Sequence, residues 1–227
     1  MTTQNQQKDN RISTSQEASF HKNSVEKGCV AIKSKSPFVV FLDIDGVVYN
    51  KPDQEGVFTK AAELFPSGEK RHTNRACSIA AAYFFNKKAL KNLSDLIEAI
   101  GQITDVWVVI SSSWRIGVTI EDLRETFFGI HNFSKYIVDK TPETISQEEI
   151  AFLCPKKRHP ETCNFQCRAA EIQFWLKQHP TVLDYVILDD DDDHLSGFGE
   201  RFVQTEYRTL LTEEMVKKFL LDRSKFC

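Results

Sequence analysis

Carboxylates and hydroxyls, which can take part in catalysis or bind a metal ion, follow three apolar segments of the sequence. They are Asp43 and Asp45, the serines at 111–113, and the five consecutive aspartates at 189–193. Two neighbouring carboxylates can divide the work of catalysis, one attacking an electrophile and the other moving protons. Carboxylates gathered without a counter-charge repel each other, and a bound divalent cation removes that cost. Because oxygen ligands favour a hard ion, these residues predict a Mg²⁺ site that pairs readily with phosphate.

The elements that must position these side chains are predicted to be alternating strands and helices. Apolar runs rich in β-branched and aromatic residues are typical of strands buried on both faces. They occupy 38–42, 106–110, 185–188 and, more briefly, 136–138. Helical patterns occupy 89–100, 120–128, 168–178 and 212–221. This alternation predicts an α/β fold with a mainly parallel sheet. Ligands of such sheets bind beyond the carboxyl ends of the strands, which is where the polar clusters would lie.

Local signals refine this picture. In an extended chain, alternation would put Asp43 and Asp45 on one side, and Gly46 then permits a sharp turn. Gly101 is expected to end the helix before it. Thr119 precedes acidic residues and is expected to cap the next helix.

Composition narrows the class of protein. The chain has 227 residues, a formal net charge of −3, 41% hydrophobic and 27% charged residues, which is ordinary globular usage. The sequence contains no run of about 18 apolar residues, so we expect no membrane-spanning helix. The N-terminus lacks the apolar core of a secretory signal peptide. The acidic balance excludes a generic nucleic-acid binder that acts by net charge. We therefore expect a cytoplasmic protein with six free thiols. Residues 1–34 are predicted to be a disordered polar tail, and residues 35–227 one folded domain.

Three segments carry a family resemblance. In order, FLDIDGVV, VVISSSWR and VILDDDDD resemble the first, second and fourth motifs of the haloacid dehalogenase-like (HAD) superfamily. Over about residues 37–205, the pattern FNKKAL…VVISSSWR…TPE…CRAAEIQFWL…VILDD is similar to the HAD domains associated with Swiss army knife RNA-repair proteins. The resemblance implies a Rossmann-like HAD fold, with a mainly parallel sheet flanked by helices.

The resemblance also implies roles for the acids. Asp43 would attack phosphorus and form an aspartyl-phosphate, and Asp45 would act as general acid and then general base. Mg²⁺ would be held by the Asp43 side chain, the Asp45 backbone carbonyl and a later acid. Asp189 is the first choice for that ligand and Asp190 the second, with Asp193 acting through water.

Other site roles follow from the same resemblance. Ser111 would donate to the phosphoryl oxygens, and Ser112 competes because the triple serine leaves the register open by one. Gly46 and Ser112 are predicted to contact substrate. Arg168 would balance charge in the transition state, with Lys156–Arg158 as rivals.

Structural interpretations compete for several of these residues. Arg168 could instead pair with Glu171 three positions on, along a solvated helix. Trp114 and Arg115 are expected to be structural, the Trp packing and the Arg pairing with an acid. The acids at 191–192 are expected to be solvated. Separately, four residues within fourteen positions could bind zinc, although paired CxxC knuckles are absent. They are Cys154, His159, Cys163 and Cys167.

Loop-like inserts near 51–84 and 141–166 are too short for a full HAD cap domain, so we expect a small or absent cap. An open site of this kind suits macromolecular or end-phosphorylated substrates. Basic residues at 70–75 and 156–159 could bind a nucleic-acid backbone or be solvated loops. The sequence predicts a Mg²⁺-dependent phosphomonoesterase acting on a phosphorylated small molecule or macromolecular end, nucleic acid included. The alternatives are a catalytically degenerate binding module and a receiver-like signalling domain.

Overall fold

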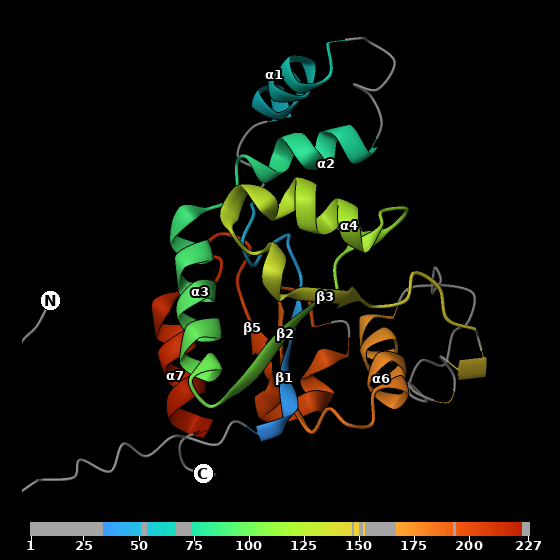
Figure 1. Cartoon of the computed structure of the whole chain (residues 1–227), viewed down its shortest axis with the longest axis vertical. Helices are drawn as coiled ribbons and strands as arrows, with labels where there is room; N and C mark the ends of the chain where they lie inside the picture. The colour runs from blue at the N-terminus through green and yellow to red at the C-terminus, as the bar shows by residue number, and fades with distance from the viewer. Residues whose placement is uncertain are drawn as a thin grey trace, which may run out of the picture. The chain divides into compact units, whose positions relative to one another are not determined.

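A five-stranded, all-parallel sheet forms the centre of the computed structural model, in the order β3-β2-β1-β4-β5 (Figure 1). The structure describes residues 34–50, 54–66, 74–146, 148–149, 152, 167–192 and 194–223. The strands are β1 (Ser34–Leu42), β2 (Thr104–Ile110), β3 (Ile137–Lys140), β4 (Asp184–Asp189) and β5 (Phe202–Gln204). This architecture confirms the predicted α/β fold with a parallel sheet flanked by helices.

Central strand β1 is buried because apolar side chains cover both of its faces. Val40 and Leu42 belong to one hydrophobic cluster, and Val39 and Phe41 belong to another on the opposite face. All four side chains are completely buried. Parallel strands covered on both faces need this continuous apolar run rather than alternation with polar residues.

Helices cover the two faces. On one face lie α3 (Lys87–Gly101) and α7 (Glu213–Arg223), and on the other lies α6 (Arg168–Gln178) (Figure 1). Their apolar stripes match these places, because α3 and α7 contribute to the cluster of Leu42, whereas α6 contributes Ile172 and Trp175 to the cluster of Phe41. The longest helix in the described ranges, α3, has 15 residues, and none of those helices is both long and apolar enough to cross a bilayer.

Helix ends agree only partly with the sequence prediction. Thr119 caps α4 (Ile120–Asp122) through a capping box with Asp122, as expected, but the predicted helix over 120–128 continues as a π-helical turn, η2 (Leu123–Phe127). Gly101 does not terminate α3 in a left-handed conformation, since the helix includes it and ends on right-handed Gln102. The 3₁₀ segments are η1 (Ser113–Arg115), η3 (Gly129–His131), η4 (Ser134–Tyr136) and η5 (Leu195–Arg201).

The first insert is helical, which corrects the expectation of a loop. It contains α1 (Gln54–Leu64) and α2 (Asn74–Ala82), which pack together beyond the carboxyl ends of the strands (Figure 1). The reason is a helical spacing that the prolines and glycines obscured. Ala61 is buried, and Val57 and Leu64, four residues before it and three after it, pack against the main core. The insert therefore forms a small helical cap.

Candidate active site

Polar side chains from neighbouring strands meet at the carboxyl edge of the sheet. Leu42, the last residue of β1, pairs with Ile110 of β2 and with Leu188 of β4. The residues that follow these three are therefore neighbours: Asp43, Ser111 and Asp189. Asp43 continues the alternation of Val39 and Phe41, so its carboxylate lies on the side of the sheet covered by α6.

Three carboxylates gather at this edge. One oxygen from each of Asp43, Asp189 and Asp190 lies within 4.8 Å of the other two. Asp43 and Asp189 are buried, and Asp190 is partly buried. Asp191 and Asp192 are exposed, which agrees with their interpretation as solvated acids, and Asp193 lies outside the described residues.

Burial makes these carboxylates costly to ionise. It raises the pKa of Asp43 to about 6, where repulsion by Asp45 adds to the shift, and that of Asp189 to about 8, where repulsion by Asp43 adds to it. The positive charge of Arg168 acts in the opposite direction on both pKa values. An all-oxygen group with excess negative charge fits a hard divalent cation, which would favour the ionised forms.

Arg168 is the cation that the structure places against these acids. Its Nη1 lies 3.5 Å from Asp43 Oδ1 and 3.6 Å from Asp189 Oδ2. Its Nε also lies 3.9 Å from Glu171 Oε2, but Glu171 is buried, so the pair does not lie on a solvated helix face. Arg168 begins α6, and the packing of that helix on the sheet directs it to the strand ends. The rivals Lys156–Arg158 lie outside the described residues.

The two candidate serines have different partners. The Ser112 hydroxyl donates a hydrogen bond to the Asp43 carboxylate, which lowers the pKa of that acid, and Ser112 also caps η1. Ser111 is buried, and its hydroxyl has no hydrogen-bond partner among the residues that the structure describes. A buried hydroxyl without a partner, next to Asp43 in the sheet register, is a candidate donor to a bound ligand.

Gly46 is required by shape. It has φ +70°, and a Cβ there would lie 2.1 Å from Asp190 Cγ. Its N–H donates to Tyr49 O, and its carbonyl accepts from Thr205 Oγ1 at 2.7 Å. Gly46, which is predicted to contact substrate, therefore has intrachain partners for both its N–H and its carbonyl. Thr205 follows the three-residue strand β5, and no pattern in the sequence singled it out.

Asp45 is held by an aromatic residue. Its Oδ2 accepts a hydrogen bond from Trp114 Nε1 at 2.8 Å. Its Oδ1 is buried and has no hydrogen-bond partner within the described part of the chain. The Trp114 ring packs against Tyr49 and Phe85, as expected of a structural residue, but the bond to Asp45 was not anticipated.

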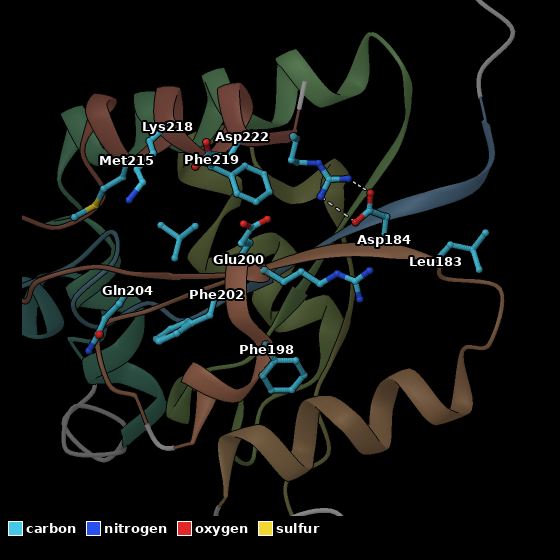
Figure 2. A pocket seen from close by; sticks show the side chains of 13 residues that line it. Leu183, Asp184, Phe198, Glu200, Phe202, Gln204, Met215, Lys218, Phe219 and Asp222 are labelled. Atoms are coloured by element: carbon cyan, nitrogen blue, oxygen red, sulfur yellow. Dashed lines mark hydrogen bonds and ion pairs between the residues drawn. The ribbon is translucent and has the colours of Figure 1, made fainter. Parts of the chain in front are cut away.

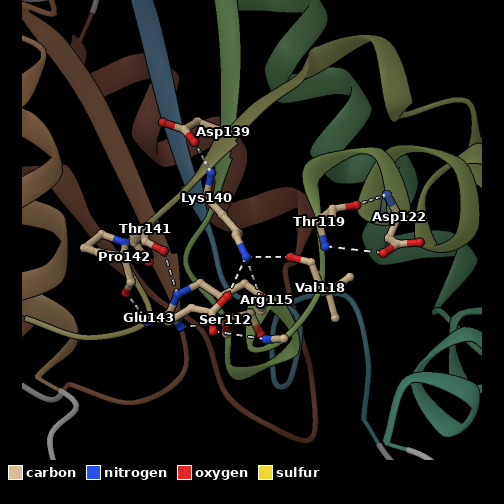
Figure 3. Close-up of polar contacts among 11 residues, drawn as sticks. Ser112, Arg115, Val118, Thr119, Asp122, Asp139, Lys140, Thr141, Pro142 and Glu143 are labelled. Carbon is tan, nitrogen blue, oxygen red and sulfur yellow. Dashed lines mark hydrogen bonds and ion pairs between the residues drawn. The ribbon is translucent and has the colours of Figure 1, made fainter.

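Arg115 joins the loops behind the site. Its guanidinium donates to the carbonyls of Ser112 at 2.7 Å, Thr141 at 3.0 Å and Pro142 at 2.9 Å (Figure 3). Arg115 is 1% exposed and pairs with Glu171 Oε2 at 2.7 Å. This agrees with the expectation that Arg115 pairs with an acid. The same acid lies near Arg168, so Arg115 ties the loops after β2 and β3 to the start of α6.

Lys140 extends this network toward the surface. Its ammonium donates to the carbonyls of Arg115 at 3.0 Å and Val118 at 2.5 Å, and to Glu143 Oε1 at 2.6 Å (Figure 3). Glu143 in turn accepts from the Gly117 N–H at 3.1 Å. These bonds fix the turn that follows Trp114 and Arg115.

A cavity of about 980 Å³ lies beside β5 and α7, lined in part by Phe198, Phe202 and Phe219 (Figure 2). Its described lining includes none of the three clustered acids.

The predicted zinc ligands Cys154, His159 and Cys163 lie outside the described residues, and Cys167 is buried against the core at the start of α6. Zinc therefore stays an untested prediction.

Comparison with known proteins identifies the family. A family model described as the HAD domain in Swiss Army Knife RNA repair proteins matches residues 39–216. No curated protein and no solved structure gives a match. The matched segment runs from β1 into α7 and includes the carboxylate cluster, Ser111, Ser112 and Arg168. The chain therefore belongs to the family of HAD domains found in Swiss army knife RNA-repair proteins.

Proposed function

We propose that this chain is a Mg²⁺-dependent phosphomonoester hydrolase that acts through an aspartyl-phosphate on Asp43. HAD membership implies a hydrolase of the phosphatase type in general. The position of Asp43 supports an aspartyl-phosphate mechanism. Asp43 is buried, lies among two further carboxylates and is 3.5 Å from the Arg168 guanidinium. A carboxylate attacks a phosphate monoester only where the negative charge of both is offset.

In the first step, an Asp43 carboxylate oxygen attacks phosphorus and the bond to the leaving oxygen breaks. Asp45 gives its proton to that oxygen. Arg168 offsets charge on the transferring group, and the Ser111 hydroxyl donates to one of its oxygens. Mg²⁺ would supply further positive charge. Its protein ligands would be the Asp43 side chain, the Asp45 backbone carbonyl and either Asp189 or Asp190.

In the second step, water attacks the phosphorus of the aspartyl-phosphate. Asp45, now ionised, takes a proton from that water, and the bond between phosphorus and the Asp43 oxygen breaks. Inorganic phosphate leaves, and Asp43 and Asp45 return to their starting forms. The same acid therefore serves both steps in opposite directions.

The small cap supports an accessible site. In the described ranges of the first insert, 54–66 and 74–84, the elements beyond the strand ends are the short helices α1 and α2. A cap of this size suits substrates whose phosphate is the end of a larger molecule, nucleic-acid ends included. Of the basic residues considered for a nucleic-acid backbone, those at 70–73 and 156–159 lie outside the described ranges.

The test is hydrolysis of p-nitrophenyl phosphate by the full chain with and without MgCl₂. We expect turnover that needs Mg²⁺ and that falls at least about a hundredfold in Asp43→Asn, because the nucleophile is lost. Asp191→Asn, which changes an exposed acid of the same run, is the matched control and should retain activity. Equal activity of Asp43→Asn and wild type would sink the mechanism. Mg²⁺ binding without any turnover across a panel of phosphorylated substrates would favour the degenerate binding module.

A further inference from the structure

Trp114 makes a polar contact in the site that its packing role does not require. The indole Nε1 donates to Asp45 Oδ2 at 2.8 Å, although the two residues are 69 positions apart. Ring centroids of Tyr49 and Phe85 lie 5.3 Å and 5.6 Å from the Trp114 ring. Contact with these two rings, which also pack on each other, holds the indole, so the N–H has a fixed direction and Asp45 a fixed partner.

The two oxygens of Asp45 are thereby made unequal. Oδ2 accepts the indole N–H, whereas Oδ1 is buried and has no hydrogen-bond partner among the described residues. A buried oxygen without a partner destabilises the folded protein, and such atoms in folded proteins call for an explanation. A substrate oxygen or water that bonds Oδ1 would remove this cost.

We infer that Trp114 is a positioning residue that directs proton transfer to Oδ1 of Asp45. The inference rests on the proposed function. With Oδ2 bonded to the indole, the transferable proton of the acid lies on Oδ1. When the bond from phosphorus to the leaving oxygen breaks, this proton passes to that oxygen, and the electron pair of the broken bond stays on it. In the second step, Oδ1 takes a proton from the attacking water.

Leaving groups report on this role. Nitrophenolate is a stable anion that departs with little help, whereas an alkoxide requires a proton as its bond to phosphorus breaks. Trp114→Phe removes the N–H and keeps a ring in the aromatic cluster. We expect kcat/KM for glycerol phosphate to fall at least about tenfold more than kcat/KM for p-nitrophenyl phosphate, since a loosely held acid donates less well. The ratio of the two values does not depend on how much of the variant is folded.

Trp175 offers a matched control. Its indole Nε1 donates to Asp139 Oδ2 at 2.6 Å, and its ring packs on Phe41 in the other hydrophobic cluster. Trp175→Phe therefore removes the same kind of bond away from the carboxylate cluster. We expect the ratio of the two kcat/KM values to stay at its wild-type level in this variant.

A second measurement tests the contact without turnover. The chain has three tryptophans, so an amide-correlation NMR spectrum contains three indole N–H signals, and Trp→Phe variants assign them. We expect Asp45→Ala to shift the Trp114 indole signal and to leave the Trp175 signal in place. An unmoved Trp114 signal would overturn the inference whatever the kinetics show.

The kinetic outcomes distinguish a positioning role of Trp114 from a role in packing alone. A selective loss on glycerol phosphate in Trp114→Phe, absent in Trp175→Phe, supports the positioning role. Equal losses on both substrates would make Trp114 a packing residue only and overturn the inference. If wild-type protein shows no turnover that depends on Asp43, the proposed function and the positioning role are both overturned. The NMR measurement would then show separately whether the contact between Trp114 and Asp45 exists.

Discussion

Burial is the property of Asp43 and Asp189 that decides their chemistry. Asp43 follows β1 and Asp189 ends β4, and the apolar side chains of these strands carry both acids into the protein, so their carboxylates have little water to stabilise charge. The Arg168 guanidinium compensates in part, at 3.5 Å and 3.6 Å from the two acids. Within the described part of the chain, the site sets the Arg168 guanidinium against three clustered acids, so full ionisation would leave it negative, which is the condition that attracts a divalent ion.

This charge excess predicts a pH dependence of stability. The two carboxyls have an ordinary pKa of 3.8, and folding raises it to about 6 for Asp43 and about 8 for Asp189. Between about pH 4 and 8 the folded state therefore binds more protons than the unfolded state, and stability falls as pH rises through that window. Mg²⁺ should restore stability most at the alkaline end. Melting temperatures across this range, with EDTA or MgCl₂, measure both effects, and a wild-type slope in Asp189→Asn would contradict the assignment.

The tight space around Gly46 predicts the effect of a substitution there on stability and Mg²⁺ binding. In Gly46→Ala the new methyl group would meet Asp190, at a φ of +70° that costs about 1–2 kcal/mol for a residue with a Cβ. We expect lower stability and weaker Mg²⁺ binding, because Asp190 must move. Gly101→Ala in α3, where a Cβ meets nothing within 4 Å, is the control and should stabilise the protein slightly. Calorimetric titration with MgCl₂ and urea unfolding check the pair, and unchanged Mg²⁺ affinity in Gly46→Ala would remove Asp190 from the site.

At the scale of elements, the site depends on how α6 is fixed against the loops after β2 and β3. Arg115 links these segments through three backbone carbonyls and the buried carboxylate of Glu171. Because the pair is almost fully buried, its value lies in mutual compensation, and either charge alone would be expensive.

Removing one partner of this pair should therefore be severe. We expect Arg115→Met to lower the free energy of unfolding by about 3–5 kcal/mol, since the Glu171 charge stays buried. Lys91→Met breaks an exposed pair with Asp95 on α3 and should leave unfolding unchanged. Urea titrations compare the two variants. A double variant, Arg115→Met with Glu171→Leu, should recover part of the loss, and failure to recover would place the defect in the lost carbonyl contacts.

At the scale of the whole molecule, order is expected to decrease from the central strand outward. β1 is paired on both edges and covered on both faces, whereas Ala61 is the only described side chain of α1 that is buried. Hydrogen exchange should show amides of residues 39–42 opening only with global unfolding and amides of α1 opening locally. Added MgCl₂ should slow the first group and leave the second nearly unchanged. Equal protection of β1 and α1 would contradict the predicted decrease in local stability from the central strand outward.

Residue patterns were enough to predict the parallel sheet and the strand ends that carry Asp43, Ser111 and Asp189. Short apolar runs rich in β-branched and aromatic residues favour a strand buried on both faces, and the residue after each run then lies at the carboxyl edge. The same patterns did not reveal α1, α2 or β5. The insert mixes helical spacing with prolines and glycines, and β5 has only three residues.

The contacts between distant side chains became visible in the folded structure. Trp114 reaches Asp45 across 69 positions, Thr205 reaches Gly46 across 159, and Arg115 meets Glu171 on another element. Such contacts depend on where helices and loops pack, and local patterns of hydrophobicity contain no signal for them. The residue types at the strand ends therefore predict the chemistry of the site, whereas the packing of helices and loops sets how its side chains are oriented.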